Sequence, residues 1–142
     1  MDQLKELAKT GFQTENLTYW DHGTMVAARF ADLMNQQNMH WKLPSWYTQN
    51  EEWIKSTLEP DLELIKTYQQ WHDIGKPIAR TIDENGKVHY PDHANISANL
   101  WLEAGGCPRI AELIRRDMEC HLLRTSGALE FAKTTDSLIL LI

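Results

Sequence analysis

Residues 71 to 77 read WHDIGKP, and this stretch places His72 directly beside Asp73. A neutral imidazole nitrogen and a carboxylate oxygen suit Mn, Fe, Co, Ni or Zn, with water completing the coordination shell. Neighbouring side chains on a helix point about 100° apart, so both can reach one ion only where the helix ends. Gly75 and Pro77 supply such an ending. The pair therefore predicts a metal site at a helix terminus.

Other histidines occur where helices are expected to begin or end. The chain holds six of them: His22, His40, His72, His89, His93 and His121. Helix bundles build metal sites by projecting such side chains inward from several helices. A single histidine near an apolar stripe is more often a core or surface residue than a ligand, and we interpret His40 in that way.

The elements that would position these residues are mostly helices. Apolar residues at helical spacing predict a helix over about residues 17–34, opened near Thr14, with His22 early in it. Pro60 is expected to be the first residue of a second helix, whose inward face is apolar. The His–Asp pair falls in the last turn of that helix.

Downstream helices would hold the remaining candidates. Asp92 is expected to cap a helix from His93 to about residue 104, which the following Gly-Gly pair ends. Pro108 is expected to open another helix, with His121 at its end. A last apolar helix is expected to begin near residue 134 or 135 and to run to the end of the sequence.

Residues 80–90 read RTIDENGKVHY and are the clearest non-helical signal. Asn85-Gly86 between short β-capable runs favours a type I′ turn, in which both central residues take positive φ. We therefore predict an all-α fold with one small β-hairpin at about residues 80–90. The length of 142 residues suits a single domain over residues 1–142. Its apolar ending, DSLILLI, suggests truncation at the C-terminus.

Composition narrows the class of partner. The formal net charge is -6, which argues against an extensive nucleic-acid surface. The two cysteines, Cys107 and Cys120, form no CxxC arrangement and fit a reducing compartment. Without a signal peptide or about 18 consecutive apolar residues, the sequence predicts a cytoplasmic protein that does not span a membrane.

A longer stretch, WHDIGKPIARTIDENGKVHYPDHANISA, resembles the HD superfamily of metal-dependent phosphohydrolases. Within it, the stretch is closest to the HD domains attached to bacterial CCA-adding tRNA nucleotidyltransferases. Three further segments are similar to the helices that carry the other family histidines: DHGTMVAARFADLM, PDHANISANLW and PRIAELIRRDMECHLL. The resemblance implies a single HD-domain helical bundle.

The resemblance also implies a ligand set. His22, His72 and Asp73 would hold the first metal, with Asp73 able to bridge to a second ion held by His93 and His121. One or two divalent ions are expected, drawn from Mn, Fe, Co, Ni or Mg. The family's last metal-binding Asp usually comes late in the final helix, where this sequence offers only Asp136. The alternative for Asp136 is a carboxylate that stabilises the N-terminus of that helix.

Several other side chains are candidates for contact with substrate. Lys76 and Arg80 could bind a phosphate near the ions; alternatively, Lys76 stabilises a helix C-terminus and Arg80 pairs with a nearby carboxylate. Asp117 lies one turn before His121 and could orient its imidazole, although a solvated or Arg-paired carboxylate is the commoner case. Of the six tryptophans, Trp20, Trp71 and Trp101 are expected in the core, and Trp41, Trp46 and Trp53 are possible pocket walls.

By resemblance, the chain is a phosphatase or phosphodiesterase that acts on a nucleotide or an RNA-terminal phosphoester through a metal-activated water. Asp73, Lys76 and Arg80 would be its catalytic residues, and its partner a small phosphorylated substrate. Two alternatives stay open: a catalytically degenerate HD module that binds a nucleotide or a partner protein, and a di-iron oxygenase of the HD type. The sequence leaves the oligomeric state undetermined.

Overall fold

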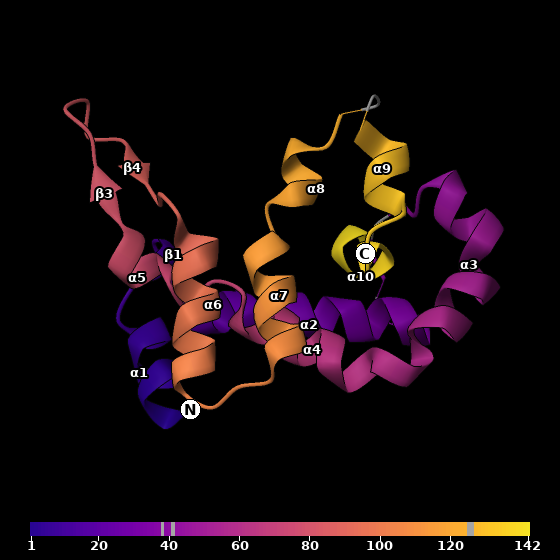
Figure 1. Ribbon diagram of the computed structural model, residues 1–142, viewed down its shortest axis with the longest axis horizontal. Helices are drawn as coiled ribbons and strands as arrows, with labels where there is room; N and C mark the ends of the chain where they lie inside the picture. Colours follow the sequence, from indigo (N-terminus) through magenta and orange to yellow (C-terminus); the bar gives the residue numbers. More distant parts are fainter. Residues whose placement is uncertain (38, 41, 125–126) are drawn as a thin grey trace.

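The computed structural model of the protein describes residues 1–37, 39–40, 42–124 and 127–142, and helices dominate it (Figure 1). The helical elements are α1 (Asp2–Lys9), α2 (Tyr19–Asn35), α3 (Ser45–Leu58), the 3₁₀ turn η1 (Glu59–Asp61), α4 (Leu62–Trp71), α5 (Lys76–Ala79), α6 (His93–Glu103), α7 (Pro108–Arg116), α8 (Glu119–Leu122), α9 (Ala128–Ala132) and α10 (Ser137–Leu141). The strands are β1 (Phe12–Thr14), β2 (Leu17–Thr18), β3 (Thr81–Ile82) and β4 (Val88–His89). The predicted fold, all-α with a small β-hairpin, is confirmed.

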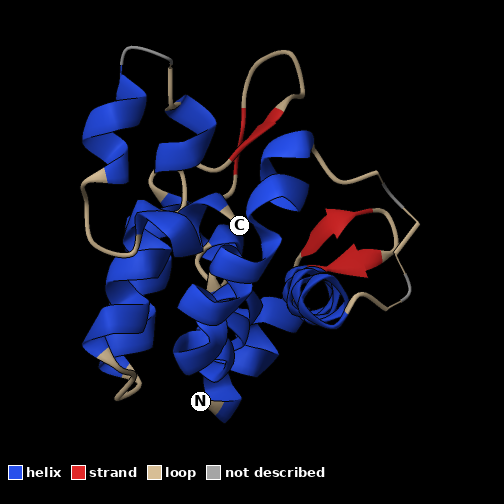
Figure 2. Cartoon of the chain, turned by 90° about the vertical axis from the view of Figure 1, so that its right-hand side faces the viewer, coloured by secondary structure: helices blue, strands red, loops and turns tan. Residues whose placement is uncertain are grey.

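The start of α2 is set by a side-chain cap. Thr18 precedes the helix, and its hydroxyl oxygen accepts a hydrogen bond from the backbone N–H of Asp21 at 3.0 Å. This is the usual way to satisfy a free amide at a helix N-terminus. Thr14, the expected opener, lies instead in β1 and pairs with Leu17 of β2 in a short antiparallel ribbon (Figure 2). The predicted start was wrong because this ribbon occupies the segment before the helix.

The helix that leads to the His–Asp pair is shorter than predicted. Pro60 lies in η1, so α4 begins only at Leu62, and it ends at Trp71. His72 is the C-cap residue, and Asp73 falls in the turn that follows. His72 keeps helical dihedrals, and the regular helix ends directly before it. This helix end is the local condition that the metal-site prediction requires.

The hairpin is confirmed at residues 81–89, but its turn is not of type I′. Thr81 pairs with His89, and Ile82 with Val88. In the turn, the backbone N–H of Gly86 donates to the Asp83 carbonyl, and Gly86 alone has positive φ. The Asp83 carboxylate accepts from the backbone N–H groups of Asn85 and Lys87, which stabilises this longer loop. Because the loop has more residues than a two-residue turn, Asn85 need not adopt positive φ.

Toward the C-terminus, the elements are short. Pro108 opens α7 as predicted, whereas His121 lies in the separate helix α8. Asp92 is the N-cap residue of α6, as predicted, but it has positive φ and its side chain makes no cap hydrogen bond. The last helix, α10, starts at Ser137, slightly later than predicted, and α9 was not predicted at all.

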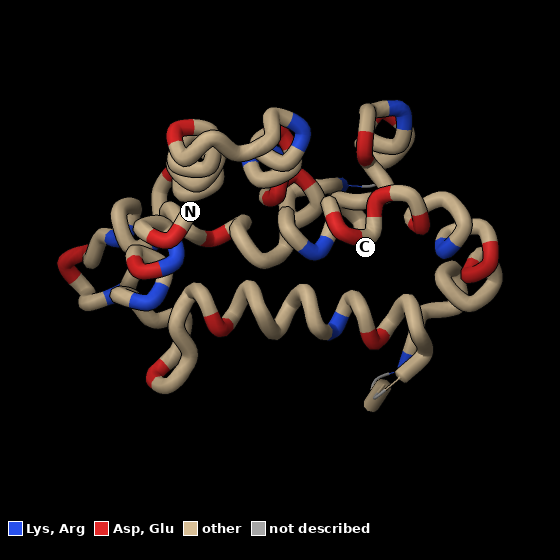
Figure 3. Tube along the Cα trace, turned by 90° about the horizontal axis from the view of Figure 1, so that it is seen from below, with Lys and Arg blue, Asp and Glu red and all other residues tan. Residues whose placement is uncertain are grey.

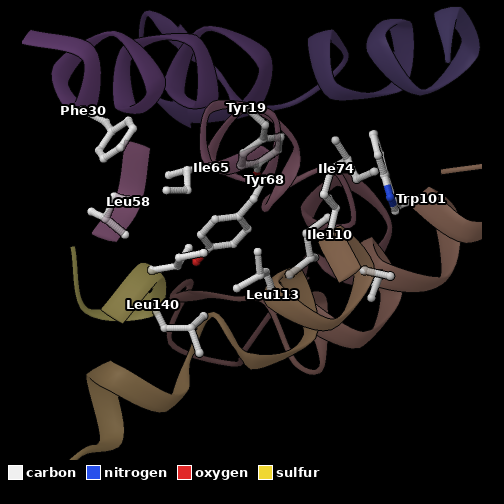
Figure 4. Packing of buried hydrophobic residues seen from close by; sticks show 14 of the residues in the cluster. Tyr19, Phe30, Leu58, Ile65, Tyr68, Ile74, Trp101, Ile110, Leu113 and Leu140 are labelled. Atoms are coloured by element: carbon white, nitrogen blue, oxygen red, sulfur yellow. The ribbon is translucent and has the colours of Figure 1, made fainter. Parts of the chain in front are cut away.

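One apolar cluster joins most of these elements. Ile65 of α4 and Ile114 of α7 are fully enclosed, and Figure 4 shows Tyr68, Ile74 and Leu113 in the same packing. Trp71 packs against Trp20 and Trp101, with ring centroids 5.0 and 5.6 Å apart. These three tryptophans belong to the core, as predicted. Trp46 and Trp53 are exposed and line a cavity, as predicted, but His22, His72 and Asp73 do not line it. Trp41 lies outside the described residues.

The charged residues are spread along the chain rather than gathered by sign. Figure 3 shows Lys and Arg positions interspersed with Asp and Glu positions along the described trace. Within the same residues, no helix has both the length and the apolar character needed to cross a membrane.

Candidate metal centre

Three elements deliver the central side chains. His22 lies in the first turn of α2, His72 and Asp73 follow α4, and His93 is the first residue of α6. α2 packs against α4, while the segment after α4 contacts α6. Residues distant in the sequence are thereby brought together.

The side chains converge on the carboxylate of Asp73. The Nε2 atoms of His72 and His22 lie 3.2 and 3.7 Å from its Oδ2, and His93 Nε2 lies 3.6 Å from its Oδ1. His22, His72 and Asp73 each offer one ligand atom, and these atoms all lie within 4.8 Å of one another. This group could hold a metal ion.

Backbone carbonyls orient two of the imidazoles. His72 Nδ1 is 2.7 Å from the carbonyl oxygen of Gln69, and His93 Nδ1 is 3.0 Å from that of Tyr90. A ring nitrogen that donates to a carbonyl carries the hydrogen, which leaves Nε2 with its lone pair available in the neutral ring. Both Nε2 atoms face Asp73, so the orientation of the rings is the one that metal ligation needs.

The burial and ionisation of the Asp73 carboxylate favour the binding of a cation. Asp73 is only 3 % exposed, and its Oδ2 has no aligned hydrogen-bond partner among the described residues. The Lys76 ammonium lies 2.7 Å from Oδ2 as an ion pair. Burial alone would raise the pKa of Asp73, but the nearby His72 imidazole and the charge of Lys76 hold that pKa well below its usual range. A buried, ionised carboxylate that three imidazole nitrogens approach fits a divalent ion.

The pKa values of His22 and His72, the two histidines beside Asp73 Oδ2, shift in opposite directions. Burial lowers the pKa of His22, and the nearby Asp73 charge opposes that effect only in part. Burial would also lower the pKa of His72, but the Asp73 carboxylate, 3.2 Å from its Nε2, raises that pKa to about 9. In the absence of metal, the proton at this site therefore resides on His72.

Two glycines allow the elements to approach this closely. A Cβ atom on Gly23 of α2 would overlap the backbone carbonyl of Gln70 in α4. A Cβ atom on Gly75 would lie 2.6 Å from the backbone nitrogen of Ser97 in α6. The hydroxyl of Ser97 accepts the Gly75 N–H at 2.8 Å, which joins the turn after Asp73 to α6. Glycine at both places is required by packing.

A cavity of about 410 Å³ opens beside the centre. Its lining includes His22 and His72 on one side and Asp117 and His121 on the other. His121 is exposed and is not part of the group around Asp73. Asp117 accepts a hydrogen bond from the Tyr68 hydroxyl at 2.5 Å. Asp117 is therefore paired with a buried tyrosine, a partner that sequence reasoning did not consider.

Asp136, predicted as a possible ligand, lies elsewhere. Its two carboxylate oxygens accept hydrogen bonds from Arg109 at 2.6 and 3.0 Å. The same guanidinium binds Asp61 through two bonds of 2.7 Å. Asp136 also precedes α10, as the alternative reading required, but it makes no side-chain cap bond there. The structure thus places Asp136 in a bridge between α7, η1 and α10.

The two predicted phosphate-binding cations differ in position. Lys76 is at the centre, where its ammonium also donates to Gln13 Oε1 at 3.0 Å and lies over the Tyr90 ring. Arg80 is exposed between α5 and β3. Gln13 comes from the β1–β2 ribbon, and no signal in the sequence linked it to this site. Tyr68 could have been found, since it lies one helical turn before His72.

Comparison of the chain with family models, with curated proteins and with solved structures gave no match in any of the three. The likeness to HD domains consequently rests on the sequence motifs alone. The geometry around Asp73 is independent of that likeness.

Proposed function

We propose that the chain is a metal-dependent phosphohydrolase of the HD superfamily that acts on a nucleotide or an RNA-terminal phosphoester. The observation that carries the proposal is the convergence of His22, His72 and His93 on the buried carboxylate of Asp73. A carboxylate that serves only the fold normally has its oxygens hydrogen-bonded. Here Oδ2 has no aligned hydrogen bond, and it faces the Nε2 atoms of His22 and His72 besides its ion pair with Lys76.

The donor set restricts the ion and supports the reaction. Imidazole nitrogens with one carboxylate suit a divalent transition metal such as Mn, Fe, Co or Ni, and Mg would rely on water for more of its shell. A divalent ion in such a site lowers the pKa of water toward neutrality and neutralises phosphate oxygens. Asp73 would contribute the negative charge that retains the ion, while its neighbouring histidines complete the protein ligands.

Lys76 would serve the substrate rather than the ion. Its ammonium lies 2.7 Å from Asp73 Oδ2, so a phosphate beside the ion would be within its reach. A lysine ammonium binds a phosphate oxygen as a compact charge. Arg80 is further out and exposed, where its long side chain could contact the distal part of a substrate. We therefore assign the primary phosphate contact to Lys76.

The same arrangement has room for a second ion in the proposal. His93 faces Oδ1 of Asp73, on the other oxygen from His22 and His72. A second ion that shares Asp73 with the first would be bound by His93. His121 would have to move across the cavity to reach that second ion. The proposal requires one ion and permits two.

The test is phosphate release from nucleotides, and ring opening or hydrolysis of cyclic phosphodiesters, with Mn, Co, Ni or Mg added. The variant is His72→Asn. Its matched control is His89→Asn, because His89 also pairs with an aspartate, Asp83 at 2.8 Å, but on the exposed hairpin. We expect turnover that is lost in His72→Asn and kept in His89→Asn.

Two other results would contradict the hydrolase. Turnover that survives in His72→Asn would show that the activity does not come from this centre. No turnover across the panel, with an ion bound in stoichiometric amount, would favour the binding module or the di-iron oxygenase. Consumption of oxygen by the iron-loaded protein then separates these two.

A further inference from the structure

Gln69 has a buried polar side chain that makes no contact with the residues of the metal centre given above. It lies in α4 one turn before His72 and is only 7 % exposed. Its backbone carbonyl oxygen is 2.7 Å from His72 Nδ1, so the main chain of Gln69 lies beside the metal centre. Its side-chain oxygen, Oε1, is buried without a hydrogen-bond partner among the described residues. Native structures rarely leave such an acceptor unsatisfied, because its desolvation is not compensated.

Two cavities meet at this side chain. The first, of about 410 Å³, begins at His22 and His72. The second, of about 260 Å³, is lined mainly by apolar side chains that include Phe30, with Arg29 also in its wall. Gln69 lines both cavities. Small-molecule sites are typically apolar clefts in which a few polar groups fix the orientation of the ligand. Gln69 has the position of such a group.

We propose that Gln69 is a specificity-determining residue of this centre. Its Oε1 accepts a hydrogen bond from a hydroxyl or amino group on the organic half of the phosphoester, which extends from the metal centre into the two cavities. This inference rests on the proposed function, in which the phosphate group of the substrate binds at the metal centre. An organic group that presents only lone pairs to Oε1, such as an ether or a second phosphate, is disfavoured because acceptor faces acceptor.

The size of the discrimination follows from the cost of an unmade bond. A site built to hydrogen-bond a substrate group rejects the analogue that lacks it, because the buried protein partner is then unpaired. For one neutral hydrogen bond, the ratio of kcat/KM values is expected to be about tenfold. The preference should therefore be measurable with pairs of esters that differ in one donor.

The experiment compares 3-hydroxypropyl phosphate with propyl phosphate, and aminophenyl phosphate with phenyl phosphate. Each pair is assayed on the unmodified chain, on Gln69→Met and on Gln49→Met, a control at an exposed glutamine of α3. Methionine keeps the length of the side chain but removes the strong acceptor. We expect at least one pair to show the preference, and Gln69→Met to abolish it by lowering kcat/KM for the donor-bearing ester alone. Gln49→Met should keep it.

Two outcomes would overturn the assignment. If neither pair shows a preference in the unmodified chain, Oε1 is satisfied by water and does not select substrate. If the preference persists in Gln69→Met, another residue supplies it. Should Gln69→Met fail to fold, Gln69→Glu retains an acceptor oxygen of similar reach; a preference kept there supports the inference, and one lost there overturns it.

Failure of the proposed function is separable from failure of this inference. If no ester releases phosphate, binding of the same esters to the Mn-loaded protein is measured by titration calorimetry. Tighter binding of a donor-bearing ester that is lost in Gln69→Met would support Gln69 as the recognition residue of a binding module. Equal binding within both pairs, or no binding of any ester, would overturn it.

Discussion

His22 Nε2 lies 3.7 Å from Oδ2 of Asp73, although α2 carries the histidine and the turn after α4 carries the aspartate. The contact depends on the close packing of α2 on α4 at Gly23. A metal centre assembled in this way should be sensitive both to its ligands and to the packing that brings them together.

Asp73 should be required for metal binding. We expect Asp73→Asn to reduce bound divalent metal to background, because the amide removes the buried negative charge and offers only weak neutral donors and acceptors. Metal content is measured by elemental analysis after equilibrium dialysis. Asp83→Asn is the control, since Asp83 pairs with His89 outside the centre. Full metal content in Asp73→Asn would contradict the assignment.

A methyl group at Gly23 should separate α2 from α4. Because its Cβ would overlap the Gln70 carbonyl, we expect Gly23→Ala to lower the free energy of unfolding by about 1–3 kcal/mol and to weaken metal binding. Urea unfolding and metal titration measure the two effects. Gly127→Ala is the control, because an added Cβ there comes no closer than 3.8 Å to Leu123. Equal behaviour of the two variants would show that the close packing at Gly23 is unimportant.

Metal affinity should rise with pH. In the metal-free protein, the Asp73 carboxylate raises the pKa of His72 to about 9, because its effect outweighs the opposing effect of burial. The ion needs the same nitrogen, so it must displace a proton. We expect the affinity to increase by about tenfold per pH unit between about pH 7 and 9, with release of one proton. Calorimetry in buffers of different ionisation enthalpy measures both quantities, and an affinity independent of pH would contradict the scheme.

The stability of the metal-free protein should change in the opposite sense. The folded-state pKa of His72 is raised above the ordinary value of 6.5. Its contribution to stability is therefore fully present below pH 6.5 and is lost as the pH rises through about 9. Asp73 stays ionised in this window because its pKa is lowered. Urea unfolding of the chelated protein should show the decrease, and His72→Asn should not.

Lys76 should affect substrate rather than metal. We expect Lys76→Gln to raise KM and to lower kcat/KM by about tenfold or more, since a charge-assisted bond to phosphate is lost. Metal affinity should stay equal or increase, because a cation 2.7 Å from Asp73 Oδ2 is removed. Lys87→Gln, on the exposed hairpin, is the control. Loss of metal in Lys76→Gln would instead make the lysine part of the centre's support.

Asp136 should not be a metal ligand in this protein. We expect Asp136→Asn to keep its metal content and to lose about 1 kcal/mol of stability or less, because its partner Arg109 is substantially exposed and also binds Asp61. Elemental analysis and urea unfolding measure the two quantities. A loss of metal comparable to that of Asp73→Asn would restore the role expected from the sequence.

Local signals in the sequence were sufficient for much of the fold and for the centre's main residues. The His72–Asp73 pair next to Gly75 and Pro77 predicted a helix end, and the structure has one there. Asn85-Gly86 predicted the hairpin, although not its turn type. Such features depend on residues that are neighbours in the chain, where backbone preferences dominate.

Contacts between residues that are distant in the sequence could not be predicted from local signals. Asp136 and Arg109 belong to different helices, and their pairing depends on how α10 meets α7. The buried Oε1 of Gln69 likewise becomes notable only once the cavities on both sides are formed. Neither relation has a periodic or local signature.

The sequence by itself determined the chemical types available here: imidazoles and carboxylates at helix ends, one hairpin, and a lysine next to the pair. Only the tertiary structure decided which of them meet: His22, His72 and His93 around Asp73, with Asp136 bound to Arg109 and His121 across a cavity. The physical reason is that helix formation is governed by nearby residues, whereas distances between helices are set by side-chain packing across the core and by the few glycines that permit close contact.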